Sequence, residues 1–160
     1  MDADEVERFW SMARDGARLT SLPGYLPSTM LEMVPPPTWS FGAGPEQADA
    51  LLALVLQGQK TATASARADY DAADEPLPEV GTLGIVLDGA GRPRALLETT
   101  DVSVVAFDQV PDEHAHAEGE GDRTLAHWRA VHERFFLEGG HDVGPDLLVV
   151  LERFRVLHRA

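Results

Sequence analysis

The sequence predicts a small α+β or barrel-like domain, in which strands form the core and helices cover it. The length of 160 residues indicates one domain with modest additions. Hydrophobic residues make up 44% and charged residues 25%, as is typical of a globular chain. Segments with helical periodicity alternate with short segments rich in Val, Ile, Leu and Thr, which indicates both helices and strands.

The N-terminal part is expected to be an extension, with a helix followed by a connection. Apolar residues recur at helical spacing over residues 4–17, for example Val6, Phe9 and Trp10. Residues 19–38 contain five prolines and one glycine, residues that interrupt helices, among them the run Pro35-Pro36-Pro37. Because this connection also carries apolar side chains, we predict that residues 1–38 form an extension packed against the main body.

The next expected elements are a helix over 45–57, a strand over 61–66 and an acidic loop over 69–78. Gly44-Pro45 is typical of a helix start and Gly58 of a helix end. The segment 61–66 alternates Thr or Ser with Ala, a β-type pattern.

The second half is expected to begin with a β-hairpin. Strands are predicted over 82–87 and 94–105, joined by a turn at Asp88-Gly89-Ala90-Gly91. Residues 107–122 read as a loop or an irregular helix, and Asp122 as the cap of a helix over 122–136. The last strand is expected over 147–157.

Composition and charge exclude several classes of function. The absence of cysteine excludes disulfide scaffolds, Cys-ligated zinc sites and thiol nucleophiles. The net charge of −14 argues against a protein that binds a long nucleic-acid duplex through its phosphates. Residues 123–160 are nearly neutral, so a local basic pocket is possible. No apolar run reaches the length of a membrane span and the N-terminus is acidic, so we expect a cytoplasmic protein with no membrane partner.

Lys60 is the single lysine among 13 cationic residues. It is either a chance exception in an arginine-rich composition or an amine where arginine cannot serve, because only an amine readily loses a proton. A hydroxyl at Thr63 and a carboxylate at Glu98 could make it part of a lysine-activated nucleophile. In a regular strand residues 60 and 63 point to opposite faces, so Lys60 must precede the strand or a bulge must intervene. Glu98 could instead simply face water.

Two further motifs have competing interpretations. His114 and His116 with Glu118 and Glu120 could chelate a divalent metal, but a solvated acidic loop is the favoured interpretation. The expected inner face of the helix is Leu125, Trp128, Val131 or His132, and Phe135. We interpret the aromatic residues there as core residues in preference to base-stacking platforms. No metal or cofactor is predicted.

Several motifs together resemble the ASCH domain family, which belongs to the PUA-like superfamily. They are, in order, Trp39-Ser-Phe-Gly42, Gly58-x-Lys60-Thr-x-Thr63, Glu79-Val-Gly81, Leu97-Glu98-Thr-Thr100 and Glu118-Gly-Glu-Gly-Asp-Arg-Thr-Leu125 followed by Trp128. The resemblance spans about Trp39 to Arg159. It implies a domain over 39–160 with a PUA-like small mixed β-barrel of five or six strands, flanked by helices.

The resemblance also implies a function. Similar proteins include bacterial amidohydrolases that act on N4-acetylcytidine, a bacterial ribonuclease and eukaryotic RNA-binding modules. Carried over, Lys60 is the base, Thr63 the nucleophile and Glu98 the carboxylate that completes the site. The candidate ligand-binding residues are Arg67, Tyr70, Arg123, Thr124 and Trp128.

We therefore predict a small hydrolase that acts on a short single strand of RNA or on a modified nucleoside. In this hydrolase Lys60 either deprotonates Thr63 or stabilises a developing charge. The alternative is a non-catalytic RNA- or nucleotide-binding module in which Lys60 and Arg123 hold a phosphate.

Overall fold

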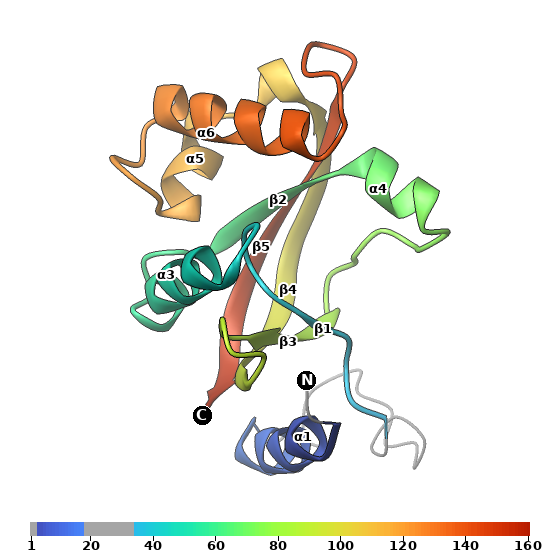
Figure 1. Ribbon diagram of the computed structural model, residues 1–160, viewed down its shortest axis with the longest axis vertical. Coiled ribbons are helices and arrows are strands. Elements are labelled where there is room, and N and C mark those ends of the chain that lie inside the picture. Colours follow the sequence, from blue (N-terminus) through green and yellow to red (C-terminus); the bar gives the residue numbers. More distant parts are fainter. Residues whose placement is uncertain (1–2, 18–33) are drawn as a thin grey trace. The chain divides into compact units, whose positions relative to one another are not determined.

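The computed structural model describes residues 3–17 and 34–160 (Figure 1). Its helices are α1 (Ala3–Ala17), α3 (Pro45–Leu56), α4 (Arg67–Ala72), α5 (Asp112–Glu118) and α6 (Leu125–Glu138), with a short 3-10 helix η2 (Phe107–Gln109). Its strands are β1 (Thr38–Trp39), β2 (Ala62–Ala66), β3 (Leu83–Leu87), β4 (Pro93–Ala106) and β5 (Leu148–Arg159). Most of the connection predicted over 19–38 lies outside the described residues.

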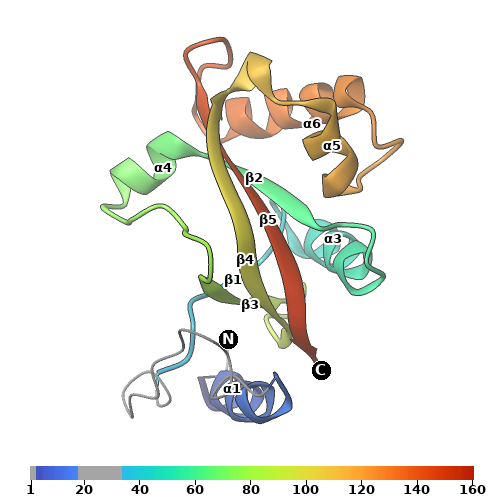
Figure 2. The ribbon, with the colours of Figure 1, turned by 180° about the vertical axis from the view of Figure 1, so that it is seen from behind.

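The described strands form one five-stranded sheet in the order β1-β3-β4-β5-β2. β1 pairs in parallel with β3, whereas β3 with β4 and β2 with β5 pair antiparallel. Figure 2 shows the long strands β4 and β5 side by side. The α+β class is thus confirmed. The described sheet is not closed, however, because the two-residue strand β1 at one end pairs with β3 and not with β2 at the other end.

The chain divides into two compact units. The first comprises residues 1–56, 83–98 and 156–160, and the second comprises 57–82 and 99–155. In the first unit the apolar stripe of α1 packs on strand residues and forms a buried core of Val6, Phe9, Trp10, Ala13, Ile85, Leu87 and Leu96. This packing explains the helical periodicity found in the sequence.

The predicted hairpin joins β3 and β4 through a turn held by Asp88. Its Oδ1 accepts hydrogen bonds from the backbone amides of Ala90 and Arg92, at 2.9 and 3.0 Å. Burial alone would raise the pKa of Asp88, but these backbone hydrogen bonds and the charge of Arg92 lower it. The carboxylate therefore stabilises the turn as an ion.

In the second unit β2, α5, α6 and β5 enclose a separate core, which includes Phe107, Trp128, Phe136, Val149 and Leu151. The helix predicted over 122–136 begins later, because Thr124 is its N-cap and accepts a hydrogen bond from the amide of His127. Asp122 instead accepts hydrogen bonds from Thr124.

The inner face of α6 also differs from the expected one. The buried residues of this helix are Trp128, His132 and Phe136, whereas Phe135 is 40% exposed. Their spacing of four residues follows one face of the helix, and Phe135 lies one residue off that face. The segment predicted as an acidic loop over 69–78 begins as the end of α4. No helix among the described residues has the length and apolar character needed to cross a membrane.

Candidate functional site

Lys60 is a buried residue with a fully hydrogen-bonded amine. It lies between α3 and β2, and it is only 2% exposed. Its Nζ donates to the carbonyl of Ala62 at 2.9 Å, to Oε1 of Glu118 at 3.3 Å and to Oε2 of Glu120 at 3.0 Å. An ammonium group has three donors, so each of its hydrogens has an acceptor here.

Contacts of the residues on either side of Lys60 bring it to the two glutamates, which lie 58 and 60 residues further along the chain. The amide of Thr61 donates to the carbonyl of Ala117 at 2.8 Å, and the side chain of Gln59 donates to the carbonyl of Gly119 at 2.6 Å. Gly119 ends α5 with a φ of +73°, and a Cβ there would collide with the carbonyl oxygen of Gln59. A glycine is therefore required at this close approach.

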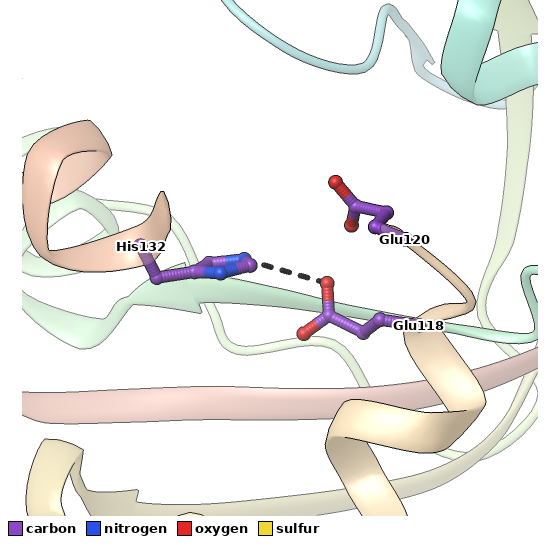
Figure 3. Close-up of side chains that lie close together, drawn as sticks. All are labelled: Glu118, Glu120 and His132. Carbon is purple, nitrogen blue, oxygen red and sulfur yellow. Dashed lines mark ion pairs between the residues drawn. The ribbon is translucent and has the colours of Figure 1, made fainter. Parts of the chain in front are cut away.

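Glu118 is the centre of the cluster. Its Oε2 lies 2.7 Å from Nε2 of His114 and accepts a hydrogen bond from the indole of Trp128. Its Oε1 lies 3.4 Å from Nε2 of His132 (Figure 3). Burial alone would raise the pKa of Glu118, but the contacts with His114 and His132 and the charge of Lys60 outweigh burial and hold this pKa well below its usual range. Glu118 is therefore a buried carboxylate ion opposite a buried ammonium.

The ring of His132 is fixed by two contacts with Trp128. The rings are stacked with centroids 4.1 Å apart and planes 15° apart. Nδ1 of His132 lies 2.9 Å from the carbonyl of Trp128, and since a carbonyl only accepts, Nδ1 is the donor. These contacts direct Nε2 of His132 toward Glu118.

Glu118, Glu120 and His132 are the residues that could hold a metal ion. One ligand atom from each lies within 4.8 Å of the others (Figure 3), and carboxylate with imidazole is a donor set that suits zinc. The amine of Lys60 already contacts both carboxylates, so the ammonium is the cation that balances them.

The interpretation of this segment as a solvated acidic loop is wrong for its central residues. His114 and Glu118 are 3% and 1% exposed, and they lie one turn apart on α5. His116 is exposed and Glu120 is half-buried. The i,i+4 spacing of His114 with Glu118, and of Trp128 with His132, is the sequence pattern that could have indicated a shared buried face.

The three predicted catalytic residues are divided between the two units. Lys60 and Thr63 belong to the second unit, whereas Glu98 belongs to the first, where it pairs with Leu83 across β3 and β4. Thr63 pairs with Glu152 of β5, so both side chains point to the same face of the sheet. Ala62 and Ala64 point to the opposite face. The hydrogen bonds described for the Lys60 amine are with Ala62, Glu118 and Glu120, and Thr63 is not among these partners.

Two of the candidate ligand-binding residues lie on α4. Arg67 is exposed at the first position of the helix. The hydroxyl of Tyr70 lies 2.9 Å from the hydroxyl of Ser65, on the same face of the sheet as Thr63. Burial, together with the nearby charge of Glu152, raises the pKa of Tyr70. Burial also raises the pKa of Glu152, despite a hydrogen bond of 3.3 Å from Thr99.

The other three candidates lie around α6. Trp128 is 3% exposed and serves as a donor to Glu118, while Thr124 caps the helix. Arg123 lines an open hollow of about 590 Å³ that also contains Thr61, Asp112, Glu113, His116, Ala117 and Arg153. Arg153, on β5, is a further cation that lines the hollow, and no sequence motif indicates it.

The helices, the mixed five-stranded sheet and the buried lysine beside α5 define an α+β domain. A family model described as the ASCH domain matches residues 37–158. The chain belongs to the ASCH domain family.

Two solved structures are similar to this chain over most of its length. One is the ASCH domain from Lactobacillus crispatus JV V101, at 32% identity and a TM-score of 0.73, covering 93% of this chain and 94% of that one. The other is protein EF3133 from Enterococcus faecalis V583, at 33% identity and a TM-score of 0.79, covering 97% and 89%. No curated protein matches the chain.

Proposed function

We propose that the chain is a hydrolase that acts on a modified nucleoside or on RNA, and that Lys60 and Glu120 carry out the reaction. The supporting observation is the 3.0 Å ion pair between the buried amine of Lys60 and Glu120. The side chain of Glu120 is 18% exposed, whereas those of Lys60 and Glu118 are 1% and 2% exposed. Glu120 is therefore the member of the cluster that a ligand can reach.

The two groups have complementary roles in the hydrolysis of an amide. The carboxylate of Glu120 accepts a proton from an attacking water, whose oxygen bonds to the carbonyl carbon. The positive charge of Lys60, next to Glu120, stabilises the negative charge that develops on the carbonyl oxygen without a direct hydrogen bond to it. The C–N bond then breaks, and the proton held by Glu120 passes to the leaving nitrogen. The family resemblance suggests that Thr63 attacks in place of water and that Glu98 supplies a further carboxylate.

The charge of the cluster favours a neutral reacting group. Lys60 contributes one positive charge, while Glu118 and Glu120 contribute two negative ones. The carboxylate of Glu120, which is the most exposed group of the cluster, opposes a phosphodiester at the pair and does not oppose an amide. An N4-acyl group on cytidine is such an amide, and we propose it as the reacting group.

The test is the release of cytidine from N4-acetylcytidine by the purified protein. Glu120→Gln should lower kcat by about 100-fold or more, because it removes the proton acceptor. Glu133→Gln, an exposed glutamate of α6, makes the same chemical change and should leave kcat unaltered. No turnover by the wild type, or equal rates in all three proteins, would overturn the proposal. A wild-type rate that falls on chelation and returns with zinc would assign the chemistry to a metal at Glu118, Glu120 and His132.

The second candidate function is a non-catalytic RNA-binding module. The supporting observation is that every hydrogen of the Lys60 amine already has an acceptor. A lysine that only stabilises the fold, and does not catalyse a reaction, would show the same bonds. This candidate predicts that the wild type binds RNA or nucleotide but does not release cytidine in the same assay.

A further inference from the structure

We propose that the hollow lined by Arg123 and Arg153 binds a phosphate group. For the substrate class this rests on the proposed function: the modified nucleoside then binds more tightly as a nucleotide or as part of RNA than as the free nucleoside. Three features of the hollow support a phosphate: the bonds of its two arginines, its charge and its connection to Lys60.

Both guanidinium groups keep donors available. Arg123 uses Nε for a hydrogen bond of 3.0 Å to the carbonyl of His116, which fixes the side chain while its two terminal nitrogens make no hydrogen bond with described residues. Arg153 makes no side-chain hydrogen bond or ion pair within the described part of the chain. In a sequence where 27 acidic residues outnumber 13 basic ones, such arginines would readily find carboxylates. Two of them in one hollow indicate an external anion.

The acidic residues of the hollow limit the size of that anion. Asp112 and Glu113 line it as well, so the formal charges of the four ionised side chains cancel. Long-range attraction of a polyanion is therefore weak. Binding must come from short, directional guanidinium bonds, which suit one phosphate group.

The hollow adjoins the Lys60 cluster along the chain. Thr61 lines the hollow and directly follows Lys60 in the sequence. Ala117 also lines the hollow and directly precedes Glu118. The amide of Arg123 donates to the carbonyl of Glu120 at 3.0 Å, so one tight turn carries both the carboxylate and the arginine. A nucleotide whose base meets Glu120 would direct its phosphate toward the hollow.

The backbone of Arg123 supports a functional reading of this turn. Its φ of +64° lies in the left-handed region, which costs a non-glycine residue of order 1 kcal/mol. Glycine occupies positions 119 and 121 of the same loop with positive φ. An arginine at position 123 thus accepts a strain that glycine would avoid.

Binding can be tested by calorimetry without turnover. We expect cytidine 5′-monophosphate to bind the wild type at least tenfold more tightly than cytidine. Arg153→Gln should lower the affinity for the monophosphate about tenfold and leave the affinity for cytidine unchanged, because it removes one charged hydrogen-bond donor group. Arg134→Gln, at an exposed position of α6, is the matched control and should have no effect. Arg123→Gln is the second variant, expected to act in the same direction.

A hexanucleotide of single-stranded RNA distinguishes the source of the phosphate. Tighter binding of the hexanucleotide than of the monophosphate, with a salt-dependence slope that falls by roughly 0.7 in Arg153→Gln, would identify RNA. Equal affinities with the same Arg153 dependence would identify a mononucleotide. Equal binding of cytidine and its monophosphate, or an equal loss in Arg134→Gln, would overturn the proposal. Phosphate-dependent binding without any turnover would refute the proposed hydrolase but not the phosphate site.

Discussion

Glu118 and Glu152 are two carboxyl groups of the same unit, and the fold changes their pKa in opposite directions. Burial raises the pKa of Glu152, which has one hydroxyl donor, Thr99. The pKa of Glu118 is well below its usual range, although this residue is more deeply buried. Its neighbours are His114, Trp128, His132 and Lys60. The donors and charges around a carboxyl group, and not its burial alone, therefore decide whether it keeps its charge.

The largest expected effect comes from removing the cation opposite Glu118. Lys60→Met leaves Glu118 and Glu120 without their ammonium in a buried place. We expect a loss of about 3–5 kcal/mol in the free energy of unfolding at pH 7, measured by urea denaturation. A loss below about 1 kcal/mol would show that Lys60 does not balance the buried charge.

The next effect concerns the charge of Glu118 itself. Because its pKa in the fold is below the unfolded value of 4.5, its stabilising contribution is complete above that value and is lost as pH falls through the folded pKa. Glu118→Gln should therefore cost about 2 kcal/mol at pH 7 and flatten the decline of stability in acid. If the variant and the wild type lose stability in parallel between pH 6 and pH 3, Glu118 is not the ion described here.

A smaller effect tests how the donors of Glu118 are held. Thr124 caps α6, the helix that carries Trp128 and His132. Thr124→Ala should cost about 1 kcal/mol of stability, because the first amides of the helix lose their acceptor. Thermal unfolding with Ser11→Ala, an exposed position within α1, as the control measures this cost, and an equal shift in both variants would argue against a specific cap.

The smallest effect has the opposite sign and belongs to Glu152. Since its pKa is raised in the fold, the charged form is disfavoured at neutral pH, and the wild type gains stability as pH falls through the folded pKa. Glu152→Gln should be as stable as the wild type at pH 7 or more stable, by no more than about 0.5 kcal/mol. A clear destabilisation at pH 7 would mean that the charged carboxylate has a partner that stabilises it.

Most helices and strands could be predicted from the sequence because their patterns are local. The hairpin around Asp88 and the helix after Pro45 follow from turn and cap residues next to them. The start of α6 was misplaced because Asp122 and Thr124 are both good caps, and only the structure shows which one accepts the hydrogen bond.

The candidate site could be predicted only in part. Lys60 was identified because it is the single lysine, but its partners lie about 60 residues away and no local pattern connects them. The glutamates of the acidic segment looked solvated because acidic residues usually are. Their burial depends on contacts with α6 and on the close approach at Gly119, which are tertiary features. The role of Glu98 stays a prediction.

Lys60 is a buried ammonium fixed between two carboxylates, and because it is the single lysine, its amine can be observed directly. Labelling with ¹⁵N-lysine gives one side-chain resonance in an NMR spectrum. We expect an ammonium signal at neutral pH with slow hydrogen exchange, because all three hydrogens are bonded and shielded from water. This signal should shift in Glu118→Gln and in Glu120→Gln, and should not shift in Glu133→Gln. A resonance that exchanges as rapidly as that of free lysine, and is the same in all variants, would contradict the account.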